Sequence, residues 1–436
     1  MMKRRGFLKA AAAAAGLQFI PGHVLGRGAS KSPNEKLNIA GIGIGGQGAG
    51  DLGQMAGENI VALCDVDANT LAKAALLHPK ARTHADFRRM LVEQKDIDAV
   101  VISTADHVHA PAAVMAMNLK KHVYCEKPLS HSIHEARVMA EVAAKSKVAT
   151  QMGNQGHASD GRRQTVELLR SGVIGPITEV HAWVMNPTWP QGIERPSHSS
   201  PVPAHLNWDL WLGPAPERPF VEKVYHPFNW RGWWDFGNGA LGDMGCHVLD
   251  SAYWGLKLGS PSTVEMLGEP RVPETGPKAS TVRMTFPARG EGLPALSLTW
   301  YDGGNLPPES VSEGVELPRG RGAIFIGSKG KIIVLGDDQG KYKLLPEKQF
   351  ADFVLPTPTI PKSPGHHEEW IQACKGQGTP MSNFAYAVGL TEIVLLGSVA
   401  WRAEKKIEWD AAAMKVRNCP EADTFLRRDY RKGWTL

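Results

Sequence analysis

Residues 37–48 read LNIAGIGIGGQG, and this stretch decides the fold. Its first half, Leu37–Ile42, is an apolar run bounded by glycine, which is typical of a buried β-strand. Its second half has the spacing G-x-G-x-x-G, with glycine at Gly43, Gly45 and Gly48. Glycine is needed there for a tight turn, for close approach of a pyrophosphate to the backbone, and for packing of the next helix on the strand. The stretch therefore predicts the first strand, loop and helix of a dinucleotide-binding Rossmann domain.

An acidic residue at the end of the next apolar run supports this interpretation. Asp65 follows the run 60–64 and lies 20 residues after Gly45. A carboxylate in that position hydrogen-bonds the adenosine ribose and repels a 2′-phosphate, which favours NAD over NADP. A second glycine register, starting at Gly41, is also open, but it would put its first glycine inside the strand.

Outward from this point, apolar runs and helical stretches alternate up to about residue 150, which indicates a parallel sheet covered on both faces. Later segments alternate apolar and polar residues with a period of two, which is typical of half-buried strands. We expect an α/β protein with a doubly wound Rossmann domain at 36–153 and a second α/β domain at 154–436 with a large, open mixed or antiparallel sheet. The runs that carry this expectation are strands at 37–42, 60–64, 99–102, 122–124, 281–286, 296–300 and 331–335, and helices at 70–77, 110–119, 368–373 and 386–403.

The first thirty residues differ from the rest in charge. The chain has a formal net charge of +5, and residues 1–30 contain five Lys and Arg and no acidic residue, so the remainder is near neutrality. Nucleic-acid binding therefore has no electrostatic support. Residues 4–9, RRGFLK, precede an apolar stretch that is too short to span a membrane. We expect a twin-arginine export signal and a periplasmic protein without a stable membrane span after export. A Sec signal or a membrane anchor is the alternative.

Polar segments follow the third and fourth predicted strands. Residues 103–109 read STADHVH, and Glu126-Lys127-Pro128 ends the fourth strand. Because ligands of doubly wound sheets bind at the carboxyl ends of the strands, both segments belong to the cofactor rim. Farther on, Asp243 and His247 have the i, i+4 spacing that puts two side chains on one face of a helix. Oxidation of a secondary alcohol requires loss of the hydroxyl proton together with a hydride, and Lys or His is suited to that proton.

These segments resemble the Gfo/Idh/MocA family, named for glucose-fructose oxidoreductase and inositol dehydrogenase. The resemblance rests on the segments 126–128, 151–157 (QMGNQGH), 230–234 (WRGWW) and 239–247 (GALGDMGCH). It implies that Lys127 contacts the reacting hydroxyl and that Asp243 and His247 form an acid/base pair. It also implies a C-terminal sheet that forms a homo-oligomer interface. The residues it assigns to the cofactor are Thr104, His107, Glu126 and Asn154.

Several of the candidate site residues could instead have a purely structural role. His157 and Arg231 are candidate substrate contacts, but a histidine in a glycine-rich loop can also cap a turn. Trp234 can stack on a sugar face or pack in the core. Lys127 could be a surface lysine, and Asp243 with His247 a helix-surface pair. The five cysteines are widely spaced, so we expect buried thiols rather than a disulfide framework, and we predict no metal.

The sequence thus predicts an NAD-dependent oxidoreductase that acts on a secondary hydroxyl of a sugar, glycoside or cyclitol. Because an exported enzyme has no pool of NAD to exchange with, we expect a tightly bound cofactor that is restored within each cycle. One alternative is a redox-assisted, NAD-dependent glycoside hydrolase. The other is a non-catalytic dinucleotide-binding protein, against which the presence of Lys127, Asp243 and His247 together argues.

Overall fold

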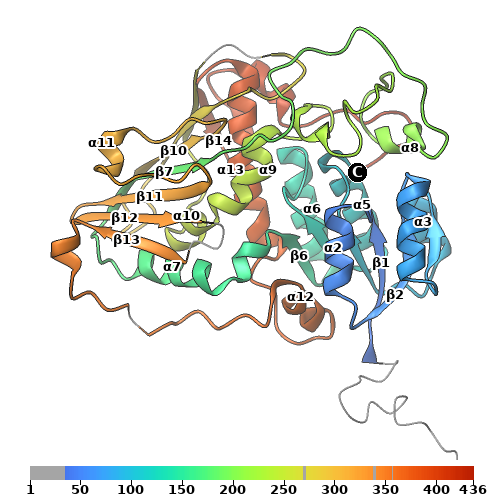
Figure 1. Ribbon diagram of the computed structural model, residues 1–436, viewed down its shortest axis with the longest axis horizontal. Helices are drawn as coiled ribbons and strands as arrows, with labels where there is room; N and C mark the ends of the chain where they lie inside the picture. The colour runs from blue at the N-terminus through green and yellow to red at the C-terminus, as the bar shows by residue number, and fades with distance from the viewer. Residues whose placement is uncertain (1–34, 269–271, 337–339, 356) are drawn as a thin grey trace, which may run out of the picture.

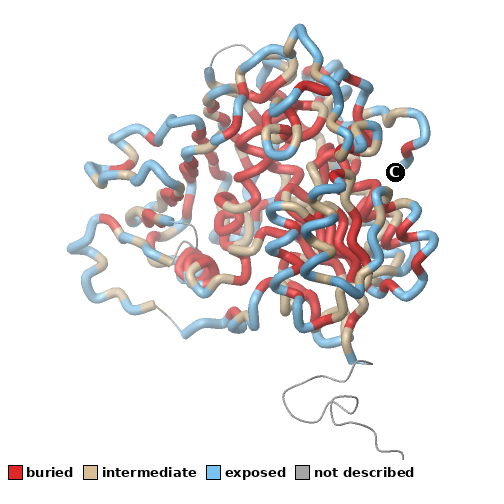
Figure 2. The backbone as a smooth tube through the Cα atoms, turned by 45° about the vertical axis from the view of Figure 1, so that its right-hand side comes forward, coloured by how far each residue is buried: buried red, intermediate tan, exposed pale blue. Residues whose placement is uncertain are grey.

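The computed structural model describes residues 35–436, apart from 269–271, 337–339 and 356. The predicted export signal at 1–30 lies outside these residues. Two sheets organise the described chain, a parallel one on the right of Figure 1 and a larger one on the left. Figure 2 shows that buried residues concentrate in the strands, while the outer helices and loops carry the exposed ones. The predicted combination of a Rossmann sheet and a second α/β layer is confirmed.

The first sheet has six parallel strands in the order β3-β2-β1-β4-β5-β6. This is the doubly wound order in which the strand sequence reverses between β1 and β4, so that a crevice opens at their carboxyl ends. The strands are β1 (Asn38–Ile42), β2 (Asn59–Cys64), β3 (Arg82–His84), β4 (Ala99–Ile102), β5 (His122–Glu126) and β6 (Thr150–Gly153).

Both faces of this sheet are buried. Alternate residues of one strand enter different apolar clusters: Val100 and Ile102 pack on one side of β4, and Val101 packs on the other. Burial on both faces explains why these strands are continuous apolar runs rather than alternating ones. The helices between the strands are α2 (Gln47–Gln54), α3 (Ala68–Leu77), α4 (Phe87–Glu93), α5 (Asp106–Asn118) and α6 (Ile133–Ser146).

The second sheet has nine strands in the order β13-β12-β11-β7-β10-β9-β8-β14-β15. It is mixed, because β10 pairs with β7 in parallel and the other pairs are antiparallel. Its strands are β7 (Ile177–Val184), β8 (Thr263–Leu267), β9 (Thr281–Phe286), β10 (Leu296–Tyr301), β11 (Arg321–Gly327), β12 (Gly330–Leu335), β13 (Lys341–Leu345), β14 (Ile407–Asp410) and β15 (Lys415–Val416). The helices after β6 are α7 (Asp160–Arg170), α8 (Trp208–Leu212), α9 (Gly239–Val248), α10 (Asp250–Gly255), α11 (Glu309–Ser312), α12 (His366–Cys374) and α13 (Phe384–Ala403).

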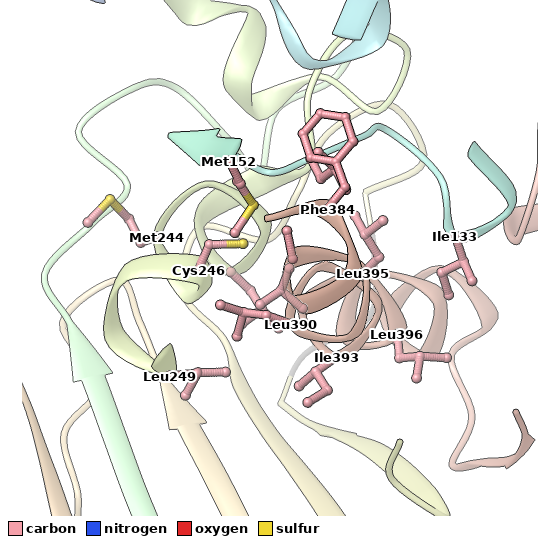
Figure 3. Packing of buried hydrophobic residues seen from close by; sticks show 14 of the residues in the cluster. Ile133, Met152, Met244, Cys246, Leu249, Phe384, Leu390, Ile393, Leu395 and Leu396 are labelled. Atoms are coloured by element: carbon pink, nitrogen blue, oxygen red, sulfur yellow. The ribbon is translucent and has the colours of Figure 1, made fainter. Parts of the chain in front are cut away.

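Helix α13 joins the two halves of the core. It packs against α9, against α6 and against β8. Figure 3 shows Leu390 of α13 beside Met152 of β6 and Cys246 of α9. By length and mean hydropathy α13 could cross a membrane, but 78% of its apolar window is buried within the protein, which identifies it as a core helix. The helix that carries Asp243 and His247 packs against β7 and β11 of the second sheet and against α13, which also contacts β6 of the Rossmann sheet.

Two late segments return to the Rossmann sheet. Trp370 and Ile371 of α12 share an apolar cluster with Ile39 of β1 and Tyr124 of β5. The last residues run across α6 and end beside α8, on the Rossmann side of Figure 1. The cysteines are free, and four of the five are buried, which agrees with the expectation of unpaired thiols.

Candidate active site

A cavity of about 670 Å³ follows the carboxyl ends of the parallel strands and extends to α9. Its size is within the usual range of ligand pockets. We call the part around Gly43, Gly45 and Asp65 the glycine-loop end, and the part around Lys127, Asp243 and His247 the lysine end. Other predicted site residues that line it are Thr104, His107, Glu126 and Arg231.

The glycine loop packs closely against its own helix α2. Gly43 has a φ of +73°, in the left-handed region that favours glycine. A Cβ atom on Gly48 would lie 1.9 Å from the carbonyl oxygen of Gly43, so no side chain fits between α2 and the loop. The loop thus brings its backbone to the cavity and turns directly into α2 (Gln47–Gln54), as the sequence predicts for a pyrophosphate cradle.

Asp65 follows β2 and is fixed by backbone groups. Its Oδ2 atom accepts a hydrogen bond from the Ile44 amide at 3.0 Å, and its Oδ1 atom accepts one from the Asp67 amide at 2.9 Å. Burial raises its pKa above the usual value, although these amides oppose the shift. The carboxylate is held beside the glycine loop before any ligand binds. The Lys and Arg residues that line the described cavity are Lys127 and Arg231, and both belong to the lysine end rather than to the end that contains Asp65.

At the lysine end, two cations share one carboxylate. Lys127 Nζ donates to Asp243 Oδ1 at 2.9 Å, and Arg231 Nε lies 3.3 Å from the same oxygen. Burial opposes ionisation of Asp243, but the charges of Lys127 and Arg231 outweigh it and lower the pKa. Burial alone would lower the pKa of Lys127, but the negative charge of Asp243 raises it. The pair is therefore an ammonium and a carboxylate at neutral pH, joining β5 of the Rossmann domain to α9.

His247 lies one turn after Asp243 on α9, as the i, i+4 spacing predicts. Burial, reinforced by the positive charge of Lys127, lowers its pKa to about 3. Its imidazole is therefore neutral at neutral pH, whereas Lys127 stays an ammonium that can donate a hydrogen bond. The two groups line the same end of the cavity and have complementary roles.

Glu126, the residue before Lys127, is buried beneath this end. Burial, reinforced by the negative charge of Asp51, raises its pKa to about 8. Gln155 donates to Glu126 Oε1 at 2.5 Å, and both side chains line the cavity. The Lys127–Pro128 peptide bond is cis. Thr104 lines the middle of the cavity, and its hydroxyl donates to the carbonyl oxygen of Ala105 at 3.1 Å.

Two residues assigned to the cofactor make their polar contacts with the protein. The ring nitrogens of His107 lie 3.2 Å from the carbonyl oxygen of Phe236 and 3.0 Å from that of Trp211. The His107 side chain lines the cavity, and its ring nitrogens connect the Rossmann domain to the segment that contains Trp211 and Phe236. Asn154 accepts a hydrogen bond from the Ser382 hydroxyl and is not among the residues that line the cavity.

Two of the three predicted substrate contacts also lie outside the cavity lining. His157 is buried, with Nδ1 3.0 Å from Asp250 Oδ2 and its ring stacked on Trp254 at a centroid distance of 4.2 Å. Trp234 packs beneath Arg402, whose guanidinium lies 5.7 Å from the ring centroid. Arg231 is the one predicted substrate contact that reaches the cavity. The structure thus places His157 and Trp234 among contacts with other protein side chains, and their contact with a substrate stays a prediction.

The sequence analysis missed several cavity residues. Trp211, His226 and Phe228 come from the Trp- and Pro-rich segment that follows β7, and Trp434 comes from the C-terminus. Aromatic enrichment of that segment was visible in the sequence, but nothing local distinguished the residues that face the cavity. Within the described ranges, no group of three or more His, Cys, Asp or Glu side chains could hold a metal ion. The absence of a metal stays a prediction.

The curated relatives match about a third of this chain. An inositol 2-dehydrogenase from Salmonella typhimurium is 33% identical over 147 residues, which cover 32% of this chain and 43% of the relative. An alpha-N-acetylgalactosaminidase from Bacteroides fragilis is 30% identical over 168 residues, which cover 36% of this chain and 39% of the relative. The chain thus spans less than half of the length of these relatives.

Solved structures share the fold over most of the chain. The WlbA dehydrogenase from Bordetella pertussis, in complex with NADH and UDP-GlcNAcA, has a TM-score of 0.61 at 16% identity and covers 86% of this chain and 99% of its own. An aldose-aldose oxidoreductase from Caulobacter crescentus, complexed with glycerol, has a TM-score of 0.56 at 15% identity and covers 86% and 100%. At 15% and 16% identity, these similarities show that the chain shares the fold of these proteins and nothing beyond it.

Two family models match the two halves of the molecule. The model described as the NAD-binding Rossmann fold of an oxidoreductase family matches residues 36–154, and the model of the C-terminal alpha/beta domain of that family matches residues 172–286. Together they cover more than half of the chain. On this evidence the chain belongs to the Gfo/Idh/MocA oxidoreductase family.

Proposed function

We propose that this protein is an NAD-dependent oxidoreductase that acts on a secondary hydroxyl of a sugar, glycoside or cyclitol. The observation that carries the proposal is the single cavity with a glycine loop and Asp65 at one end and Lys127, Asp243 and His247 at the other. A dinucleotide fits the residues present, because the glycine loop lines the cavity without side chains, turns directly into α2 and has Asp65 held beside it. When bound, the nicotinamide supplies the hydride acceptor.

The residues of the lysine end handle the proton of the hydroxyl group. The Lys127 ammonium donates a hydrogen bond to the substrate oxygen and stabilises the negative charge that develops there. His247 lines the same end of the cavity as Lys127, and we assign to it the acceptance of the hydroxyl proton. Asp243 holds Lys127 and Arg231 in place through its Oδ1 atom and compensates one of their two positive charges.

Polyol substrates are supported by what related proteins act on. The curated relatives include inositol 2-dehydrogenases, and the fold relatives include an aldose-aldose oxidoreductase. Several hydroxyl groups of a cyclic polyol can be contacted at once by the charged groups at the lysine end, while Trp230 and Phe228 supply apolar surface for its C–H face.

The choice of NAD over NADP rests on charge. Asp65 stands where a 2′-phosphate would bind, and the lining residues there include Asp86 but no Lys or Arg. The side chain of the nearby Arg88 is paired with Asp86 at 2.7 Å. A 2′-phosphate would therefore meet carboxylates without a free cation.

A tightly held cofactor is supported by a cover over the cavity. Leu210, Trp211 and Phe228 line the cavity from the segment that follows β7. This segment is attached to the Rossmann domain at Asp67, whose carboxylate oxygens lie 3.0 Å from His205 Nδ1 and 3.1 Å from His226 Nε2. Backbone bonds from Ala68 to His205 and from Asn207 to Val66 add to the attachment. Opening this cover requires all of these bonds to break together, which slows dissociation.

The second candidate is a redox-assisted glycoside hydrolase. The observation in its favour is the similarity to the Bacteroides fragilis alpha-N-acetylgalactosaminidase. In such a reaction transient oxidation acidifies a neighbouring C–H bond, elimination cleaves the glycosidic bond, and the hydride is returned. Release of a free sugar from a glycoside without net oxidation would favour this candidate.

Export through a twin-arginine signal and assembly through the nine-stranded sheet complete the proposal. Exchange of Arg4 and Arg5 for Lys should abolish export of the chain, as cell fractionation would detect. The strand β9 presents Thr281, Arg283 and Thr285 on the side of the sheet opposite Val282 and Met284, which pack in the core. Light scattering of the purified protein tests whether this face joins two copies.

The proposed function is tested by following absorbance at the NADH band during reaction with a panel of sugars and cyclitols. Purified protein should carry dinucleotide through gel filtration. We expect a rise limited to about one equivalent per site, followed by continued product formation without added NAD. The bound cofactor is then restored by reducing a second substrate, by returning the hydride to the same one, or by passing electrons to a partner. Accumulation of many equivalents of free NADH, dependent on added NAD, would leave an oxidoreductase without a retained cofactor. No oxidation of any substrate and no NAD binding would overturn the proposal.

A further inference from the structure

The C-terminal tail, residues 426–436, reaches the cavity from the far end of the chain. It is attached to the Rossmann side at several points. Its Leu426 carbonyl accepts from the His134 amide at 3.0 Å, and Arg428 Nε donates to Glu135 at 3.0 Å. Arg431 then donates to the carbonyl oxygens of Gly213 at 3.1 Å and Asp209 at 2.7 Å. The tail is thereby fixed between α6 and α8, where Figure 1 places the C-terminus.

These contacts set Trp434 into the cavity wall. Trp434 is buried and lines the cavity together with Asp86 and Phe87, the residues that follow β3. Its ring centroid lies 5.9 Å from that of Phe87, and the Arg88 guanidinium lies 4.1 Å from the Trp434 ring centroid. Arg88 also donates to the carbonyl oxygen of Gly433 at 3.1 Å. One arginine therefore holds both the ring and the backbone of the tail.

The position along the sheet tells which part of a dinucleotide this wall faces. In a doubly wound sheet the pyrophosphate lies at the loop after β1, and the carboxylate after β2 binds the adenosine ribose. The wall of Phe87 and Trp434 comes after β3, one strand farther out than Asp65, and away from the lysine end. The rings of Phe87 and Trp434 are tilted by 51° to each other, and the Arg88 guanidinium lies over the Trp434 ring. An aromatic wall beyond the ribose site is suited to a purine base, because aromatic side chains stack on bases of any kind.

We infer that Trp434 is an adenine-binding residue and that the C-terminal tail is part of the cofactor site. The inference rests on the proposed function only in taking a dinucleotide as the ligand. Trp434 is separated in sequence from the rest of the Rossmann domain, so its contribution depends on the attachment of the tail by Arg88 and Arg431.

Binding of half-cofactors to protein from which the bound dinucleotide has been removed tests this inference. AMP contains the adenosine half of NAD, and nicotinamide mononucleotide contains the other half. Calorimetry should give a dissociation constant for AMP that rises roughly tenfold or more in Trp434→Ala, with an equal change for NAD. Nicotinamide mononucleotide should bind the variant as it binds the wild type. Thr435→Ala, a change at the exposed neighbouring residue, is the matched control and should leave all three constants unchanged.

Two further measurements separate ligand contact from tail packing. Trp434→Leu keeps an apolar side chain for packing but lacks the aromatic face, so it should also lose AMP affinity. In the wild-type protein, AMP should slow hydrogen exchange in residues 426–436, and nicotinamide mononucleotide should not. An unchanged AMP constant in both Trp434 variants, or an equal loss for both half-cofactors, would overturn the inference. Failure of the wild type to bind NAD at all would instead refute the proposed function.

Discussion

The two ends of the cavity hold their polar groups in different ways. At the glycine-loop end, both oxygens of Asp65 accept hydrogen bonds from backbone amides. At the lysine end, Lys127, Asp243 and Arg231 hold one another through side chains. Backbone partners are fixed by the fold, whereas side-chain partners can be exchanged for a substrate. The glycine-loop end is therefore suited to hold a ligand in one geometry, and the lysine end is suited to accept charge and move a proton.

The lysine end should show the largest effect on rate. Lys127→Met and His247→Ala should each lower turnover on the order of a hundredfold or more while NAD still binds, because each removes a group that acts on the hydroxyl proton. Steady-state turnover with the best sugar and calorimetry with NAD check the two halves of this prediction. Lys405→Met is the matched control, since Lys405 forms an exposed ion pair with Glu421. A near-normal rate would remove the residue from the mechanism, and loss of NAD binding would indicate a structural role.

The glycine-loop end should respond to sterics rather than to chemistry. Gly48→Ala should weaken NAD binding on the order of thirtyfold, about 2 kcal/mol, because its Cβ would lie 1.9 Å from the Gly43 carbonyl oxygen. Gly50→Ala is the control on the same helix, where nothing lies within 4 Å of the added atom. Calorimetric titration of both variants decides the matter, and equal affinities would show that the loop can move to admit a side chain.

The charge of Asp65 should set the preference between cofactors. We expect the wild type to bind NAD at least ten times more tightly than NADP, about 1.4 kcal/mol, and Asp65→Asn to reduce that ratio. The same calorimetric experiment with both cofactors provides the measurement, and NADP serves as the internal control. Equal dissociation constants in the wild type would contradict the role given to this carboxylate.

The cover over the cavity should give the smallest effect. His205→Gln removes one of the two histidines that contact Asp67, while His205 itself is not among the cavity-lining residues. The dissociation rate of NAD should rise about two- to fivefold, in keeping with up to about 1 kcal/mol for a partly exposed pair. His198→Gln, at an exposed position on the same segment, is the control. An unchanged NAD dissociation rate, measured by stopped-flow displacement, would show that the cover does not contribute to cofactor retention.

The sequence predicted those parts of the fold whose structure is locally determined. The strand at 99–102 and the strand at 281–286 have the predicted bounds. A continuous apolar run indicates burial on both faces of the first strand, and alternation indicates burial on one face of the second. The three-residue strand β3 was not predicted, because Arg82, Thr83 and His84 have no apolar pattern and form a strand only by pairing with β2. Likewise, the long apolar helix α13 was visible, but its position between the two sheets was not.

The same distinction applies to the site. Lys127, Asp243 and the glycine loop belong to short motifs whose spacing fixes their geometry, and the structure brings them to one cavity. His157 belongs to a similar motif, but Asp250 and Trp254, more than ninety residues later, hold its ring in the core. Trp434 has no motif at all. Contacts between segments far apart in sequence decided both cases, and a single sequence does not contain them.

The position of the C-terminal tail has a consequence for biosynthesis. Chains fold from the N-terminus while they are made, and residues leave the ribosome in order. The Rossmann sheet is complete in sequence at Gly153, but the cavity wall that contains Trp434 is finished only after residue 434 has been released. A nascent chain that has not reached this residue therefore has an incomplete cavity.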